Sequence, residues 1–269
     1  MTKKLITRRS FIIGGSAVVT YLLWGEFSIA VRKYTIRISN LPQEYEGFTI
    51  LHLSDLHSKW FGDEQKYLLK TINQEQFDLV AITGDLVNKT DPKLEPGLEL
   101  IKGLKDKPVF FVPGNHEWWS GYKMREPLLS LGVHILENHS FKLKKGHKHL
   151  WLTGVDDPYS GRDDLEKSLT NIDDDGPIIL LAHAPEIFPK GVKSKIDLIL
   201  VGHTHGGQIR LPFIGAIIVP GQGLFPKYDY GLYREEKTNM IITGGLGESS
   251  LPIRFNIRPE IVLVTLTSK

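Results

Sequence analysis

The sequence contains no cysteine. This absence excludes disulfides, thiolate zinc sites, iron–sulfur clusters and cysteine nucleophiles, so any bound metal must have nitrogen and oxygen ligands. Beyond residue 34 the chain also lacks long linkers, internal repeats and low-complexity tracts. Its 41% hydrophobic and 24% charged residues exclude a disordered, collagen-like or coiled-coil chain and a protein with many membrane spans. One globular domain is therefore the simplest organisation of residues 34–269.

A large excess of charge of one sign is missing as well. The formal net charge is +2, and the first 30 residues alone contribute +3, so the rest of the chain is close to neutral. A duplex nucleic acid is not an expected partner, because its readers carry a dense basic face. The one basic run, residues 142–149, could contact an anionic wall polymer or lipid headgroups, or it could be a solvated hairpin turn.

Residues 1–30 are typical of an export signal or a membrane anchor. Basic and polar residues 1–9 precede an apolar stretch at residues 11–24 that glycines keep only moderately hydrophobic. Arg8 and Arg9, in the run Thr-Arg-Arg-Ser-Phe-Ile, resemble the twin-arginine signature of folded exported proteins. The segment predicts the twin-arginine translocation machinery as a partner. It also predicts a location in the cell wall or at the outer face of the cytoplasmic membrane.

The sequence leaves open whether this segment is removed. Ser28 and Ala30 supply the small residues of a candidate cleavage site before Val31. The alternative is an uncleaved anchor, because apolar character continues to about Val31.

The remaining chain predicts a layered α/β fold. Residues 34–39 alternate like a half-buried strand, and short continuous apolar runs predict strands buried on both faces. These runs are residues 49–53, 79–83, 109–112, 178–181 and 198–201. Helical patterns at residues 63–73 and 94–104, a hairpin over residues 140–153 and a final strand at residues 261–266 complete the pattern. An α-β-β-α sandwich of two sheets with outer helices fits this order.

Polar clusters follow the predicted strands, where open α/β sheets build their sites. The clusters contain Asp55 and His57; Asp85; Asn115, His116 and Glu117; His183; and His203 and His205. The steps from Asp55 to Asp85 and from Asp85 to Asn115 are each 30 residues, a plausible β-α-β repeat. Because converging imidazoles and carboxylates are costly to desolvate without a cation, so many ligand types together predict a metal centre.

In this order the blocks Asp-x-His, Gly-Asp, Gly-Asn-His-Glu, His and Gly-His-x-His resemble the calcineurin-like metallophosphoesterases. Residues 202–212, and less diagnostically residues 245–254, resemble a narrower branch of this family. That branch includes twin-arginine-exported, wall-associated phosphoesterases and UDP-2,3-diacylglucosamine diphosphatase-like enzymes. The resemblance implies the sandwich fold of that family and two divalent metal ions, with Mn, Fe, Zn and Mg all compatible with these ligands.

The resemblance also implies roles for individual residues. One metal would be held by Asp55, His57 and His205, the other by Asn115, His183 and His203, and Asp85 would bridge them. A hydroxide between the metals would attack phosphorus, so no serine or cysteine nucleophile is needed. His116 would bind the phosphate and protonate the leaving group.

Two further assignments stay open. Glu117 could orient an imidazole beside the metals, or it could be a solvated loop acid. Aromatic residues could line an apolar substrate groove or belong to the core; these are Trp118, Trp119, Tyr122, Phe213 and Phe225.

The sequence thus predicts a binuclear metal-dependent phosphoesterase acting outside the cytoplasmic membrane on a phosphodiester, diphosphate or monoester. The alternative substrate is a lipid-linked sugar-nucleotide diphosphate at the membrane. A non-catalytic scaffold of the same fold would be expected to lack His116 or a ligand, and this chain retains all of them.

Overall fold

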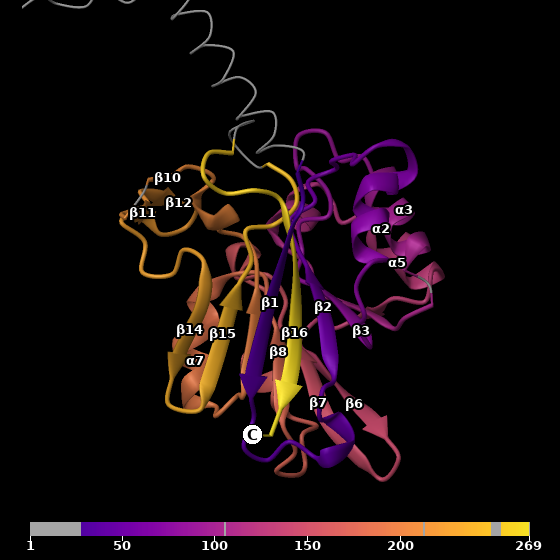
Figure 1. Cartoon of the computed structure of the whole chain (residues 1–269), viewed down its shortest axis with the longest axis vertical. Helices are drawn as coiled ribbons and strands as arrows, with labels where there is room; N and C mark the ends of the chain where they lie inside the picture. The colour runs from indigo at the N-terminus through magenta and orange to yellow at the C-terminus, as the bar shows by residue number, and fades with distance from the viewer. Residues whose placement is uncertain (1–27, 105, 212, 249–253, 269) are drawn as a thin grey trace, which may run out of the picture.

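A computed structural model of the chain describes residues 28–104, 106–211, 213–248 and 254–268. The predicted export segment, with Arg8 and Arg9, lies almost entirely outside the described residues. Two six-stranded sheets pack against each other, and helices cover their outer faces (Figure 1). This arrangement confirms the α-β-β-α sandwich expected from the sequence.

In the first sheet all neighbouring strands run parallel except one pair, which includes the last strand of the sequence. The strand order is β1 (Ala30–Arg37), β16 (Glu260–Thr267), β2 (Thr49–Leu53), β3 (Leu79–Ile82), β4 (Val109–Phe111) and β5 (His134–Ile135). Strand β16 pairs parallel with β1 and antiparallel with β2. The first residue of β1 therefore lies at the same end of the sheet as the carboxyl end of β2.

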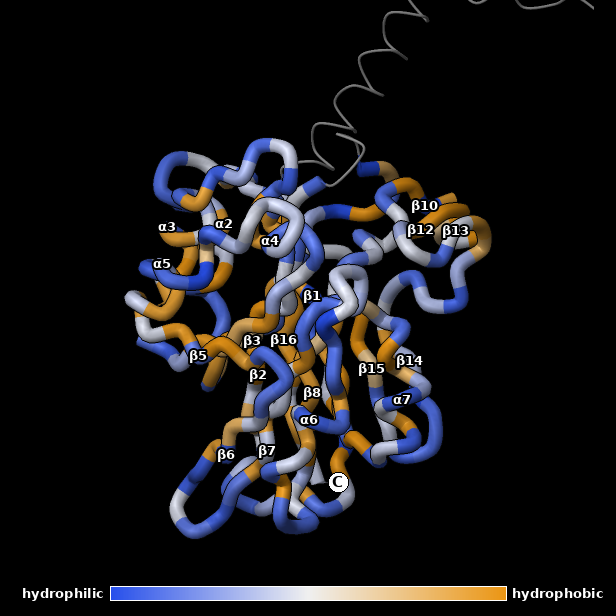
Figure 2. The backbone as a smooth tube through the Cα atoms, turned by 180° about the vertical axis from the view of Figure 1, so that it is seen from behind, coloured by the Kyte–Doolittle hydropathy of each residue, from blue (hydrophilic) through white to orange (hydrophobic). Residues whose placement is uncertain are grey.

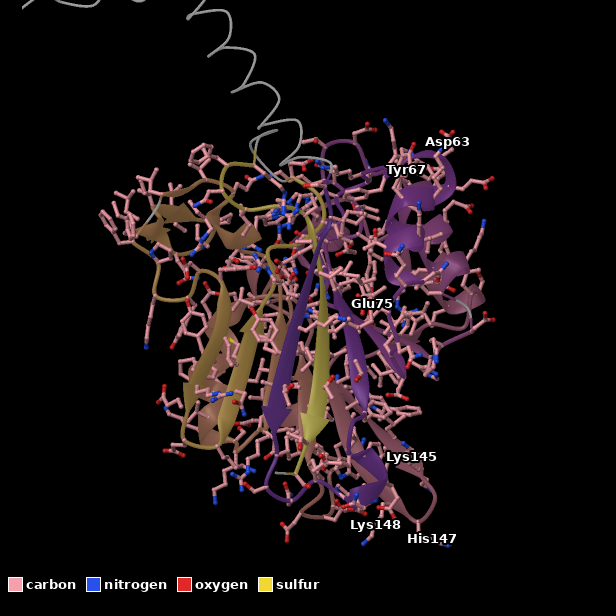
Figure 3. All side chains as sticks on the ribbon, in the orientation of Figure 1. Asp63, Tyr67, Glu75, Lys145, His147 and Lys148 are labelled. Atoms are coloured by element: carbon pink, nitrogen blue, oxygen red, sulfur yellow. The ribbon has the colours of Figure 1, made fainter. Side chains whose placement is uncertain are left out.

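The second sheet has a parallel centre and antiparallel edges. Its order is β14 (Gly231–Glu235), β15 (Thr238–Ile242), β9 (Leu198–Val201), β8 (Ile178–Leu181), β7 (Lys148–Gly154) and β6 (His139–Lys145). The turn between β6 and β7, with Lys145, His147 and Lys148, projects from the lower end of the sandwich (Figure 3).

Short helices connect the strands. The α-helices are α2 (Lys66–Ile72), α3 (Glu95–Gly103), α4 (Asn115–Trp119), α5 (Arg125–Ser130), α6 (Leu165–Leu169) and α7 (Phe188–Lys193). The 3₁₀ turns are η1 (Gln43–Tyr45), η2 (Asp63–Gln65), η3 (Pro158–Ser160), η4 (Pro185–Ile187) and η5 (His205–Gly207). Among the described residues, none of these helices has the length and apolar character needed to span a bilayer.

Two small hairpins lie at the upper end of the sandwich, beside the second sheet (Figure 1). One joins β10 (Arg210–Leu211) to β11 (Gly215–Ala216), and the other joins β12 (Ile218–Val219) to β13 (Gly223–Leu224). We refer to residues 210–225 as the apolar hairpins. In Figure 2 they form a largely hydrophobic margin of the molecule.

Apolar side chains pack in three layers. The layer between the sheets includes Ile50, Phe110, Leu152, Leu200 and Val264, all nearly fully buried. A second layer lies under α2, α3 and α5, and a third lies under α6 and α7. Burial of both faces explains why the central strands are continuous apolar runs instead of alternating ones.

The five buried strands, the β6–β7 hairpin and the final strand confirm the sequence pattern. The first strand was predicted too late, since β1 begins at Ala30 and not at residue 34. The helix expected over residues 63–73 is regular only at α2, because Glu64 and Gln65 adopt positive φ angles of 52° and 58°. His52 is a fully buried core side chain whose Nε2 lies 2.9 Å from the Thr83 hydroxyl.

Candidate metal centre

The carboxyl ends of β2, β3, β4, β8 and β9 carry all seven predicted ligands to one end of the sandwich. Each of the seven side chains is buried. They form two groups on either side of Asp85. The Asp55 group consists of Asp55, His57 and His205, and the His183 group consists of Asn115, His183 and His203.

The Asp55 group converges on a single point. The Asp55 Oδ1 atom lies 3.8 Å from Nε2 of His57 and 3.5 Å from Nε2 of His205. The two imidazole Nε2 atoms are 3.0 Å apart. One carboxylate oxygen and two ring nitrogens thus offer three ligand atoms to one cation.

The His183 group forms a second such point. Nε2 of His183 lies 3.1 Å from Oδ1 of Asn115 and 3.0 Å from Nδ1 of His203. Between the groups, Oδ2 of Asp85 lies 3.3 Å from Nε2 of His183 and 3.7 Å from Nε2 of His57. Asp85 therefore faces both groups.

Strained backbone aims these side chains. Five of the seven residues have φ in the left-handed region: 54° at Asp55, 49° at His57, 54° at Asp85, 67° at His203 and 51° at His205. Such a conformation costs a non-glycine residue about 1–3 kcal/mol and is found where surrounding structure enforces it, often at functional sites. The strands end in turns that direct consecutive side chains into one crevice.

Close backbone approach at this edge requires glycine at two positions. Gly84 has a φ of +87°, and a Cβ there would lie 2.5 Å from the backbone nitrogen of Gly114. At Gly202 a Cβ would collide with the side chains of Ser54 and Asp55. A larger residue at either position would displace a candidate ligand.

Glu117 holds the loop that carries Asp85. Its fully buried carboxylate accepts N–H bonds from Asp85 at 2.8 Å, Leu86 at 2.7 Å and Gly114 at 2.8 Å. It is therefore neither the solvated loop acid of the sequence analysis nor hydrogen-bonded to an imidazole. Burial and the neighbouring Asp85 raise the pKa of Glu117 to about 8.

Burial sets the protonation of the imidazoles. It lowers the pKa of His57 and of His203 to about 3. At His183 burial acts in the same direction, but the carboxylates of Asp85 and Asp55 and the Thr83 carbonyl together outweigh it and raise the pKa to about 10. These carboxylates therefore favour positive charge on this side of the centre, whether a proton or a bound cation supplies it.

Arg254 supports the Asp55 group from behind, which the sequence analysis did not foresee. Its side chain is 1% exposed and donates to the Gly244 carbonyl at 2.9 Å and to the Gly247 carbonyl. The Gly247 carbonyl also lies 3.2 Å from Nδ1 of His205. A buried guanidinium far along the chain thereby positions a candidate ligand, and only the fold reveals this connection.

His116 lies beside the two groups and is oriented by a backbone donor. The N–H of Lys89 donates to Nδ1 of His116 at 3.1 Å, so in this geometry the ring proton is on Nε2. Nε2 is 4.0 Å from Oδ2 of Asp85, and the His116 side chain lines the adjoining cavity. The sequence motif could not reveal this tautomer.

A cavity of about 260 Å³ opens onto the centre. Its lining includes Asp85, Lys89, Asn115, His116, Trp119, Tyr159, His203, His205, Pro220 and Gly221. Nζ of Lys89 lies 4.8 Å above the Trp119 ring, and the Tyr159 ring stacks on His203 with centroids 4.5 Å apart. Lys89 and Tyr159 carried no sequence signal.

The sequence left open whether five aromatic residues line a substrate groove or belong to the core. Of these five, only Trp119 lines the cavity, where it is 50% exposed. Tyr122 is buried, and Trp118 packs against the core and donates to Asp156 at 2.7 Å. Phe213 and Phe225 lie exposed on the apolar hairpins.

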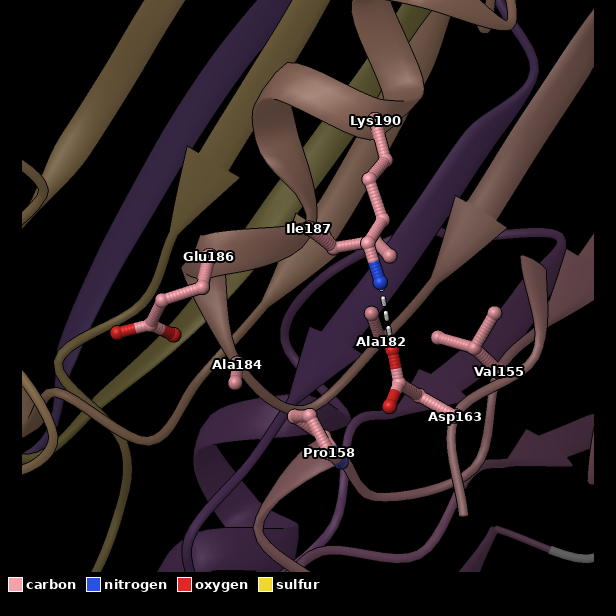
Figure 4. Close-up of a pocket in the computed structure, with 8 residues that line it drawn as sticks. All are labelled: Val155, Pro158, Asp163, Ala182, Ala184, Glu186, Ile187 and Lys190. Atoms are coloured by element: carbon pink, nitrogen blue, oxygen red, sulfur yellow. Dashed lines mark hydrogen bonds and ion pairs between the residues drawn. The ribbon is translucent and has the colours of Figure 1, made fainter. Parts of the chain in front are cut away.

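A smaller cavity of about 130 Å³ lies beside η4 and α7 (Figure 4). It is lined mainly by apolar side chains, with Glu186 and an Asp163–Lys190 ion pair of 3.0 Å at its margin. None of the candidate ligands lines it.

The donor set fits two divalent cations. Within the described residues, three groups of carboxylate and imidazole side chains each bring their ligand atoms within 4.8 Å of one another, and all three groups lie at this centre. Neutral imidazoles combined with carboxylate and amide oxygens are compatible with Mn, Fe, Zn and Mg.

Residues 48–207 match the model of the family described as calcineurin-like phosphoesterase. The chain belongs to this family, and it is a metal-dependent phosphoester hydrolase.

Curated relatives agree with this assignment. An uncharacterized metallophosphoesterase, YkuE of Bacillus subtilis, is 33% identical over 266 residues, covering 95% of this chain and 91% of the relative. A Helicobacter pylori metallophosphoesterase, also uncharacterized, is 34% identical and covers 89% of this chain, which spans 64% of that protein. A transmembrane protein with metallophosphoesterase domain from Danio rerio is 30% identical to this chain. The match covers 86% of this chain and 56% of that relative.

Proposed function

We propose that this protein hydrolyses a phosphodiester, diphosphate or phosphomonoester outside the cytoplasmic membrane, using two divalent metal ions. The observation that carries this proposal is the position of Asp85 between two convergent ligand groups, 3.3 Å from His183 and 3.7 Å from His57. One carboxylate shared by two cations offsets their mutual repulsion.

Each side of the centre would hold one metal. In this proposal Asp55, His57 and His205 bind the first ion, Asn115, His183 and His203 bind the second, and Asp85 binds both. When bound, the metals supply Lewis acidity and an activated water as the nucleophile. Glu117 and Arg254 do not reach the ions but hold the backbone from which the ligands project.

His116 would contact the substrate. His116 lines the cavity, and its Nε2–H would donate to a phosphate oxygen as negative charge develops there. Protonation of the leaving group by the same ring would require Nδ1 to give up its bond from Lys89. Phosphate binding is thus the role that this geometry supports more directly.

In this proposal the leaving group of the substrate would lie beside Trp119 and Lys89. The Lys89 ammonium stands over a half-exposed indole at the cavity wall. This pair offers an anionic substrate a positive charge and a flat apolar surface side by side. A cavity of about 260 Å³ can enclose a phosphoryl group and a small part of its substituent.

A lipid-linked diphosphate is the second candidate substrate, and one observation favours it. Pro220 and Gly221, between β12 and β13, line the cavity and also belong to the exposed apolar hairpins. An acyl chain leaving the cavity on that side would meet apolar surface. The transmembrane relative of Danio rerio agrees with a membrane setting for this kind of domain.

The direct test loads the purified full chain with Mn, Fe, Zn or Mg and assays phosphomonoesters, diesters and sugar-nucleotide lipids. We expect two metal equivalents and hydrolysis of at least one class. Two bound metals without hydrolysis of any class would favour the scaffold alternative.

The export assignment has its own prediction. We expect Arg8→Lys together with Arg9→Lys to block export, because the translocation machinery recognises the arginines and not their charge. Export of the double variant is compared with that of the original chain in cells with and without that machinery. Unchanged export of the variant through this route would refute the assignment.

A further inference from the structure

Large apolar side chains gather on one exposed surface of the molecule. Of the twelve that are exposed within the described residues, seven lie on or next to the apolar hairpins. The most exposed are Phe213 at 109%, Phe225 at 74%, Leu224 at 67%, Ile214 at 62% and Ile218 at 57%. Single exposed apolar residues are ordinary on a soluble surface, but a contiguous group of this size indicates an interaction site.

Apart from Arg210, which is paired with Asp229 at the base of the hairpins, this surface carries no charge. Residues 211–226 contain no charged side chain. Figure 2 shows the hairpins as a predominantly hydrophobic projection, in contrast to the mixed colouring of the lower end.

The hairpins are fixed to the metal centre. Arg210 bonds the Gly206 carbonyl at 3.0 Å and the Asp229 carboxylate at 2.9 Å. The Thr204 hydroxyl donates to the Asp229 carbonyl at 2.7 Å. Because Thr204 and Gly206 flank the candidate ligand His205, these bonds hold the hairpins against the turn that carries this ligand. Pro220 and Gly221 of the hairpins also line the cavity.

The described part of the chain begins at the same end of the sandwich. Strand β1 starts at Ala30, on the edge where the ligand-bearing strands end, and the Ala30 N–H bonds the Pro259 carbonyl at 2.8 Å. The apolar stretch of the sequence ends at Trp24, four residues before Ser28, the first described residue. Four residues span at most about 14 Å, so an apolar stretch inserted in a bilayer would keep Ser28 near its surface.

We propose that the apolar hairpins dock on the surface of a lipid bilayer, with Phe213, Ile214 and Phe225 inserted among the lipids. The cavity would then open at the level of the headgroups, where a phosphoester carried by a lipid is presented. The basic turn between β6 and β7 projects from the other end and would stay in water (Figure 3). The docking itself does not depend on hydrolysis, so each can fail alone.

A bilayer suits this surface better than a protein partner does. A stable protein interface combines an apolar centre with a polar rim and about one hydrogen bond per 100–200 Å². Here the apolar side chains protrude from hairpin ends with no charged neighbour in residues 211–226. Aromatic and branched side chains at such ends can enter a fluid lipid surface without a matching cavity.

The absence of cysteine makes a direct test possible. Single variants of the full chain, Ile214→Cys and Phe225→Cys, are labelled with a nitroxide and reconstituted in vesicles of phosphatidylglycerol and phosphatidylethanolamine. Leu129→Cys on α5, where the native side chain is 41% exposed, and His147→Cys at the other end of the sandwich serve as matched controls. Thermal unfolding and metal content verify that each variant folds.

We expect the labels at 214 and 225 to gain collisions with oxygen, and to lose collisions with a water-soluble nickel chelate, by several-fold on addition of vesicles. The labels at 129 and 147 should not change. If all four labels remain equally accessible to nickel, the hairpins do not dock on lipid. Spin–spin broadening at 214 that grows with protein concentration and persists with vesicles would instead assign the surface to a second copy of the chain.

Discussion

The two sides of the metal centre are built differently, although each offers three ligand side chains. All three residues of the Asp55 group have positive φ angles, and His205 among them is supported by Gly247 and Arg254, which lie almost 200 positions further along the chain than Asp55. In the His183 group only His203 has such an angle. There Asn115 starts α4, and Nδ1 of His183 lies 2.7 Å from the Thr83 carbonyl.

This difference shows two ways to position a ligand. The Asp55 group relies on strained turns and on long-range support, so its geometry should depend on the packing of the last part of the chain. The His183 group relies on hydrogen bonds to neighbouring strand ends. Asp85 belongs to both, because its side chain faces both groups and Glu117 holds its backbone.

Loss of the shared carboxylate should have the largest effect. We expect Asp85→Ala to lose most of both metals, because no other side chain contributes to both sides. Asp85→Asn retains an acceptor for the backbone N–H of His116, which donates to Oδ1 of Asp85 at 2.9 Å, but it removes the charge and should lose nearly as much. Elemental analysis gives the stoichiometry, and two full equivalents in Asp85→Ala would contradict the bridging role.

Substitution of a ligand in only one of the two groups should remove only the metal that this group holds. We expect His57→Ala and Asn115→Ala each to retain about one equivalent, since the opposite group remains complete. Anomalous scattering from crystals of the two variants would show which position is empty. The same position empty in both would show that the two groups are assigned wrongly.

Arg254 should affect the Asp55 group alone, and less strongly. We expect Arg254→Met to weaken metal binding on that side by about 10- to 100-fold, because the support of His205 through Gly247 is lost. The second metal in the same protein is the internal control. Titration with Mn²⁺ measures both affinities, and equal weakening of the two would mean a general loss of stability.

His116 should have the smallest effect on the metals and a large one on turnover. We expect His116→Ala to retain both ions and to lose about 10²- to 10⁴-fold in turnover of alkyl phosphoesters. If it mainly donates to phosphate, the loss should be similar for nitrophenyl esters, whose leaving group needs no proton. A much smaller loss for nitrophenyl esters would instead support protonation of the leaving group.

The sequence predicts most of the sandwich because burial on both faces leaves a plain signal in short apolar runs. It also predicts which residues meet at the centre, since parallel strands end at a common edge. Their roles as ligands and the export signal stay predictions.

Other features depend on contacts between distant parts of the chain. The place of β16 between β1 and β2, and the burial of Arg254 behind His205, follow from packing and have no local pattern. The apolar hairpins have strands of two residues, too short for a periodicity to be recognised. The exposure of Phe213 and Phe225 could not be predicted from their residue type, because aromatic side chains are more often buried.

The early start of β1 bears on how the protein would mature. The candidate cleavage point between Ala30 and Val31 lies inside this strand, where Ala30 is 3% exposed and faces Glu260 of β16. A peptidase must take its substrate as a free extended segment, so the folded protein protects this bond until β1 separates from β16. A chain that folds before it crosses the membrane would keep its amino-terminal segment, and a chain cut first would be released. The order of folding and proteolysis would therefore decide whether the enzyme stays tethered, and amino-terminal sequencing of the mature protein reads out that order.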